Sequence, residues 1–135
     1  TKPPYRRITA IDLNTGEHVW QTAFGKGPAN HPLLEHLNLP DLGSVFTDVS
    51  AEGGILITEG LVISHLPQKD EINEDADGSI LVAYDKLTGD KVGEVTVDRR
   101  LHGPVMSYLS GGKQYIAIAG GRFDTAEMIS FALPD

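Results

Sequence analysis

The sequence has no cysteine among its 135 residues. This excludes disulfide bonds, thiolate metal ligands and a cysteine nucleophile within the chain. Basic residues are also scarce, because 11 Lys and Arg stand against 19 Asp and Glu and give a formal net charge of −8. Since like charges repel, this balance disfavours nucleic acid as a partner.

Long apolar runs are missing too. The longest, such as Ile55–Ile57 and Tyr115–Ala119, have the length of strands and fall far short of the roughly 20 residues that a membrane-spanning helix needs. The sequence therefore predicts no transmembrane segment in this chain. It opens with TKPPYRR rather than Met or a signal-like stretch, which is typical of an internal cut or a processed end.

The residues that are present favour an all-β fold. The chain has 15 glycines, and its apolar residues come in short β-rich runs between turn signals rather than at helical spacing. The expected strands are Arg7–Asp12, His18–Phe24, Ser44–Ser50, Ile55–Thr58 running on into Leu61–His65, Ser79–Tyr84, Lys91–Val97, Val105–Leu109, Gln114–Ala119 and Met128–Leu133.

Two segments depart from this strand pattern. In the loop of residues 25–43 we expect one or two helical turns, with Asn30 or His31 as the cap and Pro32 at the first helical position, where no N–H is needed. The segment Pro67–Gly78 is acidic and almost without apolar residues, so it is expected to be a solvated excursion between strands.

One motif occurs twice. Ala10–Trp20 reads AIDLNTGEHVW and Ala83–Gly93 reads AYDKLTGDKVG, with the same Ala, Asp, Thr, Gly and Val at corresponding positions. A period of about 70 residues with some four strands per unit is typical of a β-propeller. The predicted parts are the end of one blade in residues 1–24, a loop insertion with a short helix in 25–43, a complete blade in 44–97 and three strands of the last blade in 98–135.

The repeated residues have expected structural roles. Asp12 ends a strand and can accept hydrogen bonds from the backbone N–H groups of the following turn. Gly16 supplies the positive φ that lets the next strand leave the turn. Asp85 and Gly89 are expected to do the same in the second copy. Since a propeller needs roughly 4 to 8 blades to close, about two blades of four-stranded antiparallel sheet cannot close one alone.

The motifs taken in order resemble a known family. AIDLNTGEHVW, HPLLEHLNLPDLG, GGILITEGLVIS, SILVAYDKLTGDKV, GPVMSYLSGGKQYIAIAGG and the ending ISFALPD resemble the carboxy-terminal part of the PQQ-dependent quinoprotein dehydrogenases, in the glucose-dehydrogenase-like branch. The resemblance implies an eight-bladed propeller in a longer chain that oxidises sugars or alcohols, with pyrroloquinoline quinone held by calcium. It also implies a periplasmic location in bacteria and a quinone or cytochrome as electron acceptor.

The resemblance also assigns roles within this segment. Trp20 is expected to be a docking tryptophan whose ring packs against the neighbouring blade, so that its loss costs roughly 3 to 5 kcal/mol; Gly93 occupies the matching place in the second copy. The family's catalytic aspartate and its calcium-binding Glu and Asn come from preceding blades, and no residue here matches their motifs. The isolated chain is therefore expected to be inactive.

The acidic excursion contains a candidate calcium site. Asn73, Asp75 and Asp77 place oxygen ligands at alternate positions before Gly78, as short calcium loops do. Tyr84 stands at the twelfth position, where such loops carry a bidentate Glu. A solvated acidic loop remains the alternative.

Two further residues are candidates for the substrate rim. His102 precedes the inner strand of the last blade and could face the axis, or it could be an ordinary turn histidine. Arg122 stands where relatives of the glucose-dehydrogenase branch often carry His, which puts glucose itself in doubt as the substrate. The alternative for Arg122 is an exposed loop arginine that pairs with Asp124.

The remaining charged and histidine pairs are expected to be surface residues. His31 and His36 are five positions apart, which does not bring them to one helical face, so a metal there is not expected. Arg99 and Arg100 are expected to balance nearby carboxylates rather than to bind an anion.

Three functional hypotheses follow from the sequence. The leading one is a carboxy-terminal segment of a PQQ- and calcium-dependent sugar or alcohol dehydrogenase, completed by the other blades of the same enzyme or by a companion chain. The second is a non-catalytic PQQ-repeat propeller scaffold of the cell envelope. The third is a small β domain that oligomerises and binds calcium through its acidic loop.

Overall fold

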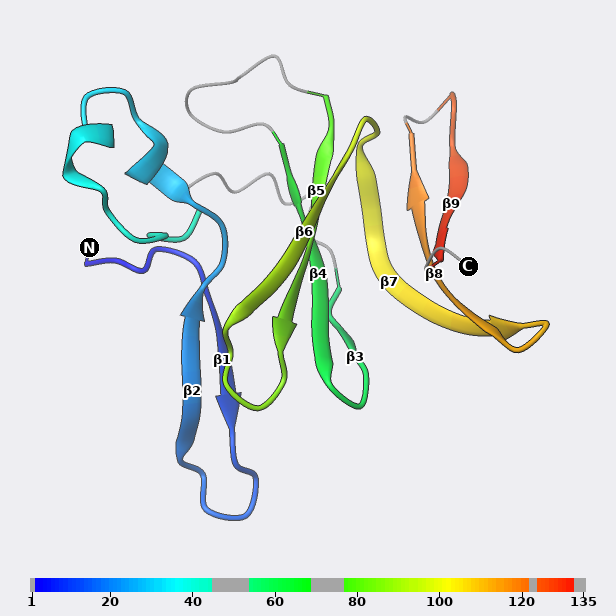
Figure 1. The fold of residues 1–135 in the computed structure, drawn as a ribbon, viewed down its shortest axis with the longest axis horizontal. Helices are drawn as coiled ribbons and strands as arrows, with labels where there is room; N and C mark the ends of the chain where they lie inside the picture. Colours follow the sequence, from blue (N-terminus) through cyan, green and yellow to red (C-terminus); the bar gives the residue numbers. More distant parts are fainter. Residues whose placement is uncertain (1, 45–53, 69–76, 122–123, 133–135) are drawn as a thin grey trace. The chain divides into compact units, whose positions relative to one another are not determined.

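The fold is made of antiparallel sheets, as a computed structural model of the chain shows (Figure 1). It describes residues 2–44, 54–68, 77–121 and 124–132. The described strands form one sheet of two, one of four in the order β3-β4-β5-β6 and one of three in the order β7-β8-β9. The all-β expectation is thus confirmed. The strands are β1 Arg7–Ile11, β2 His18–Ala23, β3 Leu56–Ile57, β4 Leu61–Pro67, β5 Ser79–Asp85, β6 Lys91–Val97, β7 Leu101–Ser110, β8 Lys113–Gly120 and β9 Glu127–Ala132.

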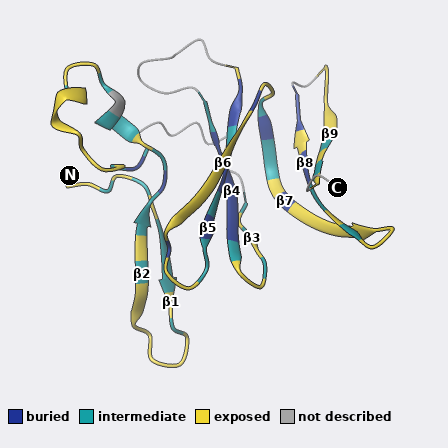
Figure 2. Cartoon of the chain, viewed as in Figure 1, coloured by how far each residue is buried: buried dark blue, intermediate teal, exposed yellow. Residues whose placement is uncertain are grey.

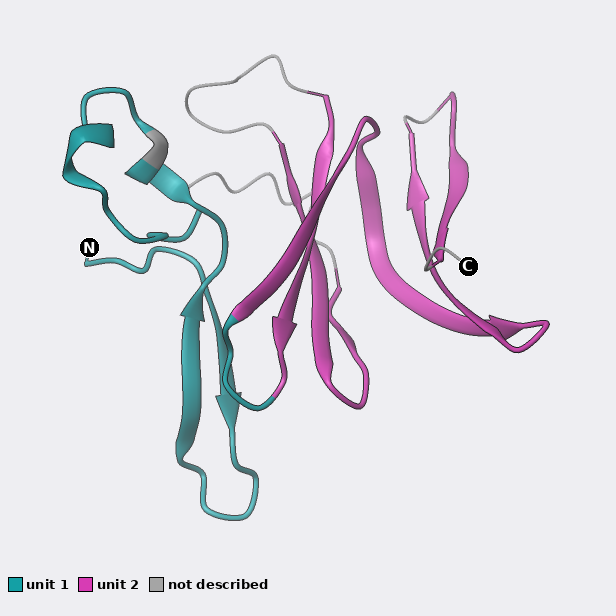
Figure 3. Cartoon of the chain, viewed as in Figure 1, with its two compact units in different colours: residues 1–47, 69–76, 87–90 teal, residues 48–68, 77–86, 91–135 magenta. Residues whose placement is uncertain are grey.

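The chain divides into two compact units (Figure 3). Unit 1 comprises residues 1–47, 69–76 and 87–90, and unit 2 comprises residues 48–68, 77–86 and 91–135. Among the described residues no helix is long and apolar enough to cross a membrane.

Unit 1 contains the hairpin of β1 and β2 and the loop that follows it. The loop is closed at its base by backbone hydrogen bonds, in which the N–H groups of Leu42, Gly43 and Ser44 donate to the carbonyls of Lys26, Gly25 and Phe24. These bonds hold the two ends of the loop side by side. The guanidinium of Arg6 lies 5.7 Å from the centroid of the Phe24 ring beside them.

The helical turns in this loop are 3₁₀ turns, and the expected position of the proline was wrong. The first of them, η1, is Gly27–Asn30, and the second, η2, is Glu35–Leu37. Pro28 lies at the start of η1, whereas Pro32 lies outside both turns. The reason is that a residue before proline avoids the helical region. His31 accordingly has φ −65° and ψ 130° and ends η1 rather than starting a helix.

The predicted continuous strand from Ile55 to His65 was also wrong. Leu56–Ile57 and Leu61–Pro67 are separate strands that pair antiparallel, with Leu56 opposite Ile63. The turn between them is closed because the Thr58 N–H donates to the Leu61 carbonyl at 2.9 Å. The expected strand Ser44–Ser50 lies, apart from Ser44, outside the described residues.

The core of unit 2 lies between its two sheets. Leu101 and Ile118 are completely buried there. β6 is an edge strand of the four-stranded sheet. Its residues are exposed (Figure 2), except for Val97, which is buried. The buried core residues are Ile63, Leu81, Val97, Leu101, Val105 and Ile118.

Candidate functional site

The two copies of the repeat form the same kind of turn. In the first, the Asn14 N–H donates to Asp12 Oδ1 at 2.7 Å, and Gly16 has φ +75°. In the second, Asp85 ends β5 and Gly89 has φ +78°. The hydrogen bond to Asp12 and the positive φ of both glycines are those that the sequence predicts.

A threonine stabilises each turn. The Glu17 N–H donates to Thr15 Oγ1 at 3.2 Å in the first copy, and the Asp90 N–H donates to Thr88 Oγ1 at the same distance in the second. The shared Thr-Gly pair therefore has a shared function in closing the turn, which explains why both residues occur in both copies.

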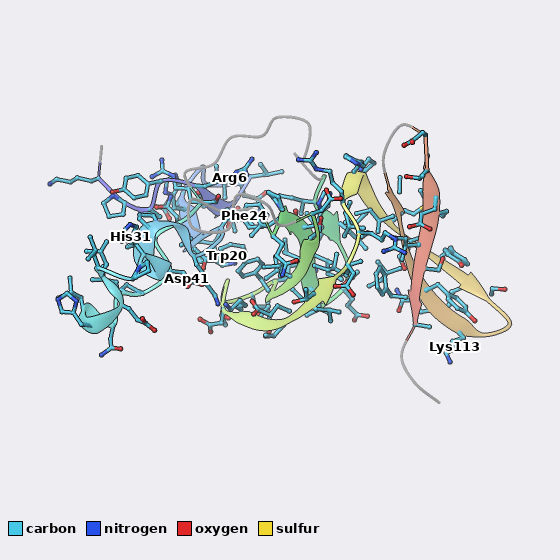
Figure 4. All side chains as sticks on the ribbon, turned by 90° about the horizontal axis from the view of Figure 1, so that it is seen from above. Arg6, Trp20, Phe24, His31, Asp41 and Lys113 are labelled. Atoms are coloured by element: carbon cyan, nitrogen blue, oxygen red, sulfur yellow. The ribbon has the colours of Figure 1, made fainter. Side chains whose placement is uncertain are left out.

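Trp20 lies against the second turn. A Cβ atom added to Gly89 would come within 2.5 Å of Trp20 Cε3 and 2.7 Å of Cδ2, so the indole ring occupies the space above this glycine. Both residues belong to unit 1, and the half-buried Trp20 is labelled in Figure 4. Gly93, by contrast, has no atom within 4 Å of such a Cβ. The first copy of the repeat thus supplies the indole ring, and the second copy supplies the glycine against which the ring packs.

Unit 2 contains a set of buried polar side chains that sequence reasoning missed. Ser64, His65 and Ser79 are each only 1% exposed. Ser79 Oγ accepts a hydrogen bond from the Leu101 N–H at 2.9 Å, and His65 Nε2 lies 3.0 Å from the Gly103 carbonyl oxygen. We call these three side chains the polar seam, since Ser79 and His65 connect the four-stranded sheet to β7.

The polar seam meets β7 where that strand is irregular. β7 pairs with β8 at His102 and again from Met106, and the register shifts between them. Within this bulge Gly103 has φ +70°, and Pro104 has no N–H to donate. His65 donates a hydrogen bond to the Gly103 carbonyl in this segment, where the pairing with β8 is irregular.

Ser64 reaches the same bulge indirectly. Its hydroxyl donates to the Gly54 carbonyl at 3.3 Å. Gly54 in turn lies against Pro104, because a Cβ at Gly54 would come within 2.9 Å of Pro104 Cβ. The bulge is therefore held from two directions, by the imidazole of His65 and by the backbone of Gly54.

The structure places one of the two predicted rim residues. His102 is half-buried, and its Nε2 lies 2.8 Å from the Gly121 carbonyl oxygen. The Gly121 N–H donates to the Arg100 carbonyl at 2.9 Å, so His102 and Arg100 hold the residue that follows β8. Arg122 lies outside the described residues.

The calcium candidates are only partly within the described residues. Asn73 and Asp75 lie outside them, and Asp77 is exposed. In the part of the chain that the structure describes, no group of three or more His, Cys, Asp or Glu side chains could hold a metal ion.

The remaining charged and histidine candidates lie near the surface. Arg99 forms an exposed ion pair with Glu127 at 3.0 Å, as expected for a basic residue that balances a carboxylate. His31 Nδ1 accepts a hydrogen bond from the Leu33 N–H at 3.2 Å, and His36 is exposed in η2.

Burial dominates the electrostatics of the polar seam. Desolvation lowers the pKa of His65 from its usual 6.5, the hydrogen bond to Gly103 opposes this, and electrostatic interaction with His102 adds to the lowering. The neutral ring donates through Nε2, and its buried Nδ1 has no hydrogen-bond partner. His65 is thus held as a neutral imidazole near pH 7.

This lowered pKa predicts acid sensitivity. The unfolded chain binds a proton at His65 below about pH 6.5 while the folded chain does not, so stability falls as the pH drops from 6.5 towards the folded pKa. One such group changes the free energy of unfolding by at most about 1.4 kcal/mol per pH unit. The free energy of unfolding, measured by denaturation at pH 5 to 8, should change less steeply with pH in His65→Gln than in the wild type. Equal pH slopes in the two proteins would contradict the assignment of this acid sensitivity to His65.

The chain is similar to a known family and to several curated proteins. A family model described as the PQQ glucose/ethanol/alcohol dehydrogenase beta-propeller domain matches residues 1–116. The glycerol dehydrogenase large subunit of Gluconobacter oxydans (strain 621H) is 32% identical over 99% of this chain and 17% of its own length. The quinoprotein glucose dehydrogenase A of Acinetobacter calcoaceticus is 29% identical over 99% of the chain and 16% of its own length.

A third relative is a probable quinate dehydrogenase (quinone) of Xanthomonas campestris pv. juglandis, 29% identical over 98% of this chain and 16% of its own length. The chain therefore spans about a sixth of the length of the curated relatives that it matches.

Proposed function

This chain belongs to the PQQ-dependent glucose/ethanol/alcohol dehydrogenase beta-propeller family, and we propose that it is a carboxy-terminal segment of an enzyme that oxidises a hydroxyl group of a sugar or other polyhydroxy compound. The family match over residues 1–116 is the observation that carries the proposal. The relatives are named for glycerol, quinate and glucose, which share several hydroxyl groups. The proposed substrate class is therefore compounds with several hydroxyl groups.

The segment's proposed contribution is structural. The contact of Trp20 with Gly89 supports a docking role, in which a tryptophan of one repeat stabilises the turn of the next. In the complete propeller this contact would recur between blades and keep them in register. The other blades, from the same enzyme or from a companion chain, are the proposed partners of this segment.

The described residues do not make a site for the calcium ion of such an enzyme, because no acidic or histidine cluster of sufficient size occurs among them. We therefore assign no catalytic step to them. PQQ, bound by the complete enzyme, would supply the hydride acceptor, and a quinone or cytochrome in the bacterial periplasm would take the electrons. His102 and Arg122 are proposed to border the substrate entrance.

The proposal is tested by activity of the full-length protein. The protein is loaded with PQQ and calcium and assayed with glycerol, quinate, glucose and ethanol, with an artificial electron acceptor as the readout. We expect oxidation of at least one polyhydroxy compound that requires PQQ. Turnover of ethanol alone would contradict the substrate class. Complete inactivity of the loaded protein would favour the envelope-scaffold alternative.

A further inference from the structure

We infer that His65 is a positioning residue for the bulge of β7, which lies between His102 and Met106 and contains Gly103, Pro104 and Val105. The inference deepens the proposed function and rests on it, because His102, directly before the bulge, is proposed to border the entrance for a polyhydroxy substrate. His65 lies on a different sheet and acts through the Gly103 carbonyl at 3.0 Å, not by contact with substrate.

The position of His65 in its strand aims it at the bulge. Ile63 and His65 are two positions apart on β4, so they point to the same face of the sheet. Ile63 packs in the core with Leu101 and Val105 of β7. The imidazole therefore reaches β7 from within a packed core, where its orientation is fixed by its neighbours.

Besides His65, the contact of Gly54 with Pro104 holds the bulge, but the pairing of the bulge with β8 is irregular. Its backbone lacks regular pairing with β8 between His102 and Met106. A positive φ at Gly103 and the missing N–H of Pro104 also make this segment a poor partner for any strand. On one side, Ser79 fixes the N–H of Leu101. The Gly103 carbonyl, at the start of the irregular segment, is held by His65.

The effect on the rim passes along the backbone from Gly103 to His102. Gly103 follows His102 directly, so a change in the Gly103 backbone is expected to shift His102. His102 also holds Gly121 at the end of β8 through its 2.8 Å contact. Loss of the His65 hydrogen bond is therefore expected to loosen the start of β7 and the end of β8 together.

The test compares three variants of the full-length protein. His65→Leu fills the site without a donor, and His65→Gln offers an amide N–H in its place. Val62→Ala is the matched control, because Val62 is a buried residue of the same strand whose side chain points to the opposite face. It should lower stability by forming a cavity without releasing the bulge.

Two readouts separate positioning from stability. Hydrogen exchange of peptides covering residues 101–110 and 113–121 should become about tenfold faster in His65→Leu, the change expected for one lost buried hydrogen bond. The KM for the polyhydroxy substrate should rise by a similar factor, about tenfold, with kcat little changed. His65→Gln should recover most of both effects. Val62→Ala should leave the KM unchanged and should not accelerate exchange of these two peptides more than that of the other strands of unit 2.

Each contrary result has a distinct meaning. Unchanged exchange in His65→Leu would overturn the inference whether or not the protein is an enzyme. Faster exchange with an unchanged KM would also overturn it and leave His65 as a purely structural residue. A loaded wild type that oxidises none of the compounds would overturn the proposed function and the substrate role with it, while exchange would still decide whether His65 holds the bulge.

Discussion

Trp20→Ala is expected to lower the free energy of unfolding by about 3 kcal/mol, near the lower end of the range for loss of a buried tryptophan. The lower end applies because the ring is half-buried. The loss arises because the indole covers Gly89, and removal of the ring takes away this contact. Chemical denaturation of the full-length protein measures the change.

Gly93→Ala is the matched control for this variant. Gly93 stands at the position that corresponds to Trp20 in the second repeat, and a methyl group there meets nothing within 4 Å. Its effect should stay within about 0.5 kcal/mol, as for other surface substitutions. Equal losses for the two variants would refute the docking role of Trp20.

Gly89→Ala is expected to be the second large effect, with a loss of about 2 to 4 kcal/mol. One part of the cost is the left-handed backbone, since φ is +78° at this residue. The other part is the clash of the new methyl group with Trp20, whose ring atoms lie 2.5 and 2.7 Å from it. Denaturation curves of the variant and the wild type give the sum of the two.

The repeat itself provides the control that separates these parts. Gly16 has nearly the same φ, +75°, in the first copy of the turn, but a methyl group there meets nothing within 4 Å. Gly16→Ala should therefore show only the backbone cost of roughly 1 to 2 kcal/mol. In a Trp20→Ala background the cost of Gly89→Ala should fall to that of Gly16→Ala. If the cost stays unchanged in that background, the ring does not rest on Gly89.

The turns were predictable because their signals are local. Asp12 and Gly16 lie four residues apart, and the hydrogen bonds of the turn join near neighbours in sequence. The repeat then made it possible to transfer the same conformation to Gly89. Alternating and short apolar runs similarly predicted most strands of the three sheets.

The errors have local causes as well. The hairpin between β3 and β4 was missed because its turn, Glu59-Gly60, lacks the Asn-Gly or Asp-Gly pair that marks two-residue turns. Pro32 suggested a helix start, but its effect on the preceding residue decided the outcome. The first error thus comes from a turn without its usual sequence signal, and the second from the constraint that proline places on the residue before it.

The polar seam could not be predicted from local patterns. His65 reaches a carbonyl 38 residues away, and Ser79 reaches an N–H 22 residues away, so both contacts depend on how the two sheets of unit 2 pack. The only signal in the sequence was a Ser-His pair within the otherwise apolar run LVISHLP. Such a pair in a strand that is buried on both faces indicates polar partners elsewhere in the fold.

Binding of PQQ to the full-length protein tests the central claim most directly. PQQ is titrated into the cofactor-free protein in the presence of calcium, and binding is followed by isothermal titration calorimetry. If this segment belongs to a PQQ-dependent dehydrogenase, the titration should saturate at about one PQQ per chain, the stoichiometry of a single cofactor site. Absence of saturable binding in a folded protein with calcium present would contradict the claim.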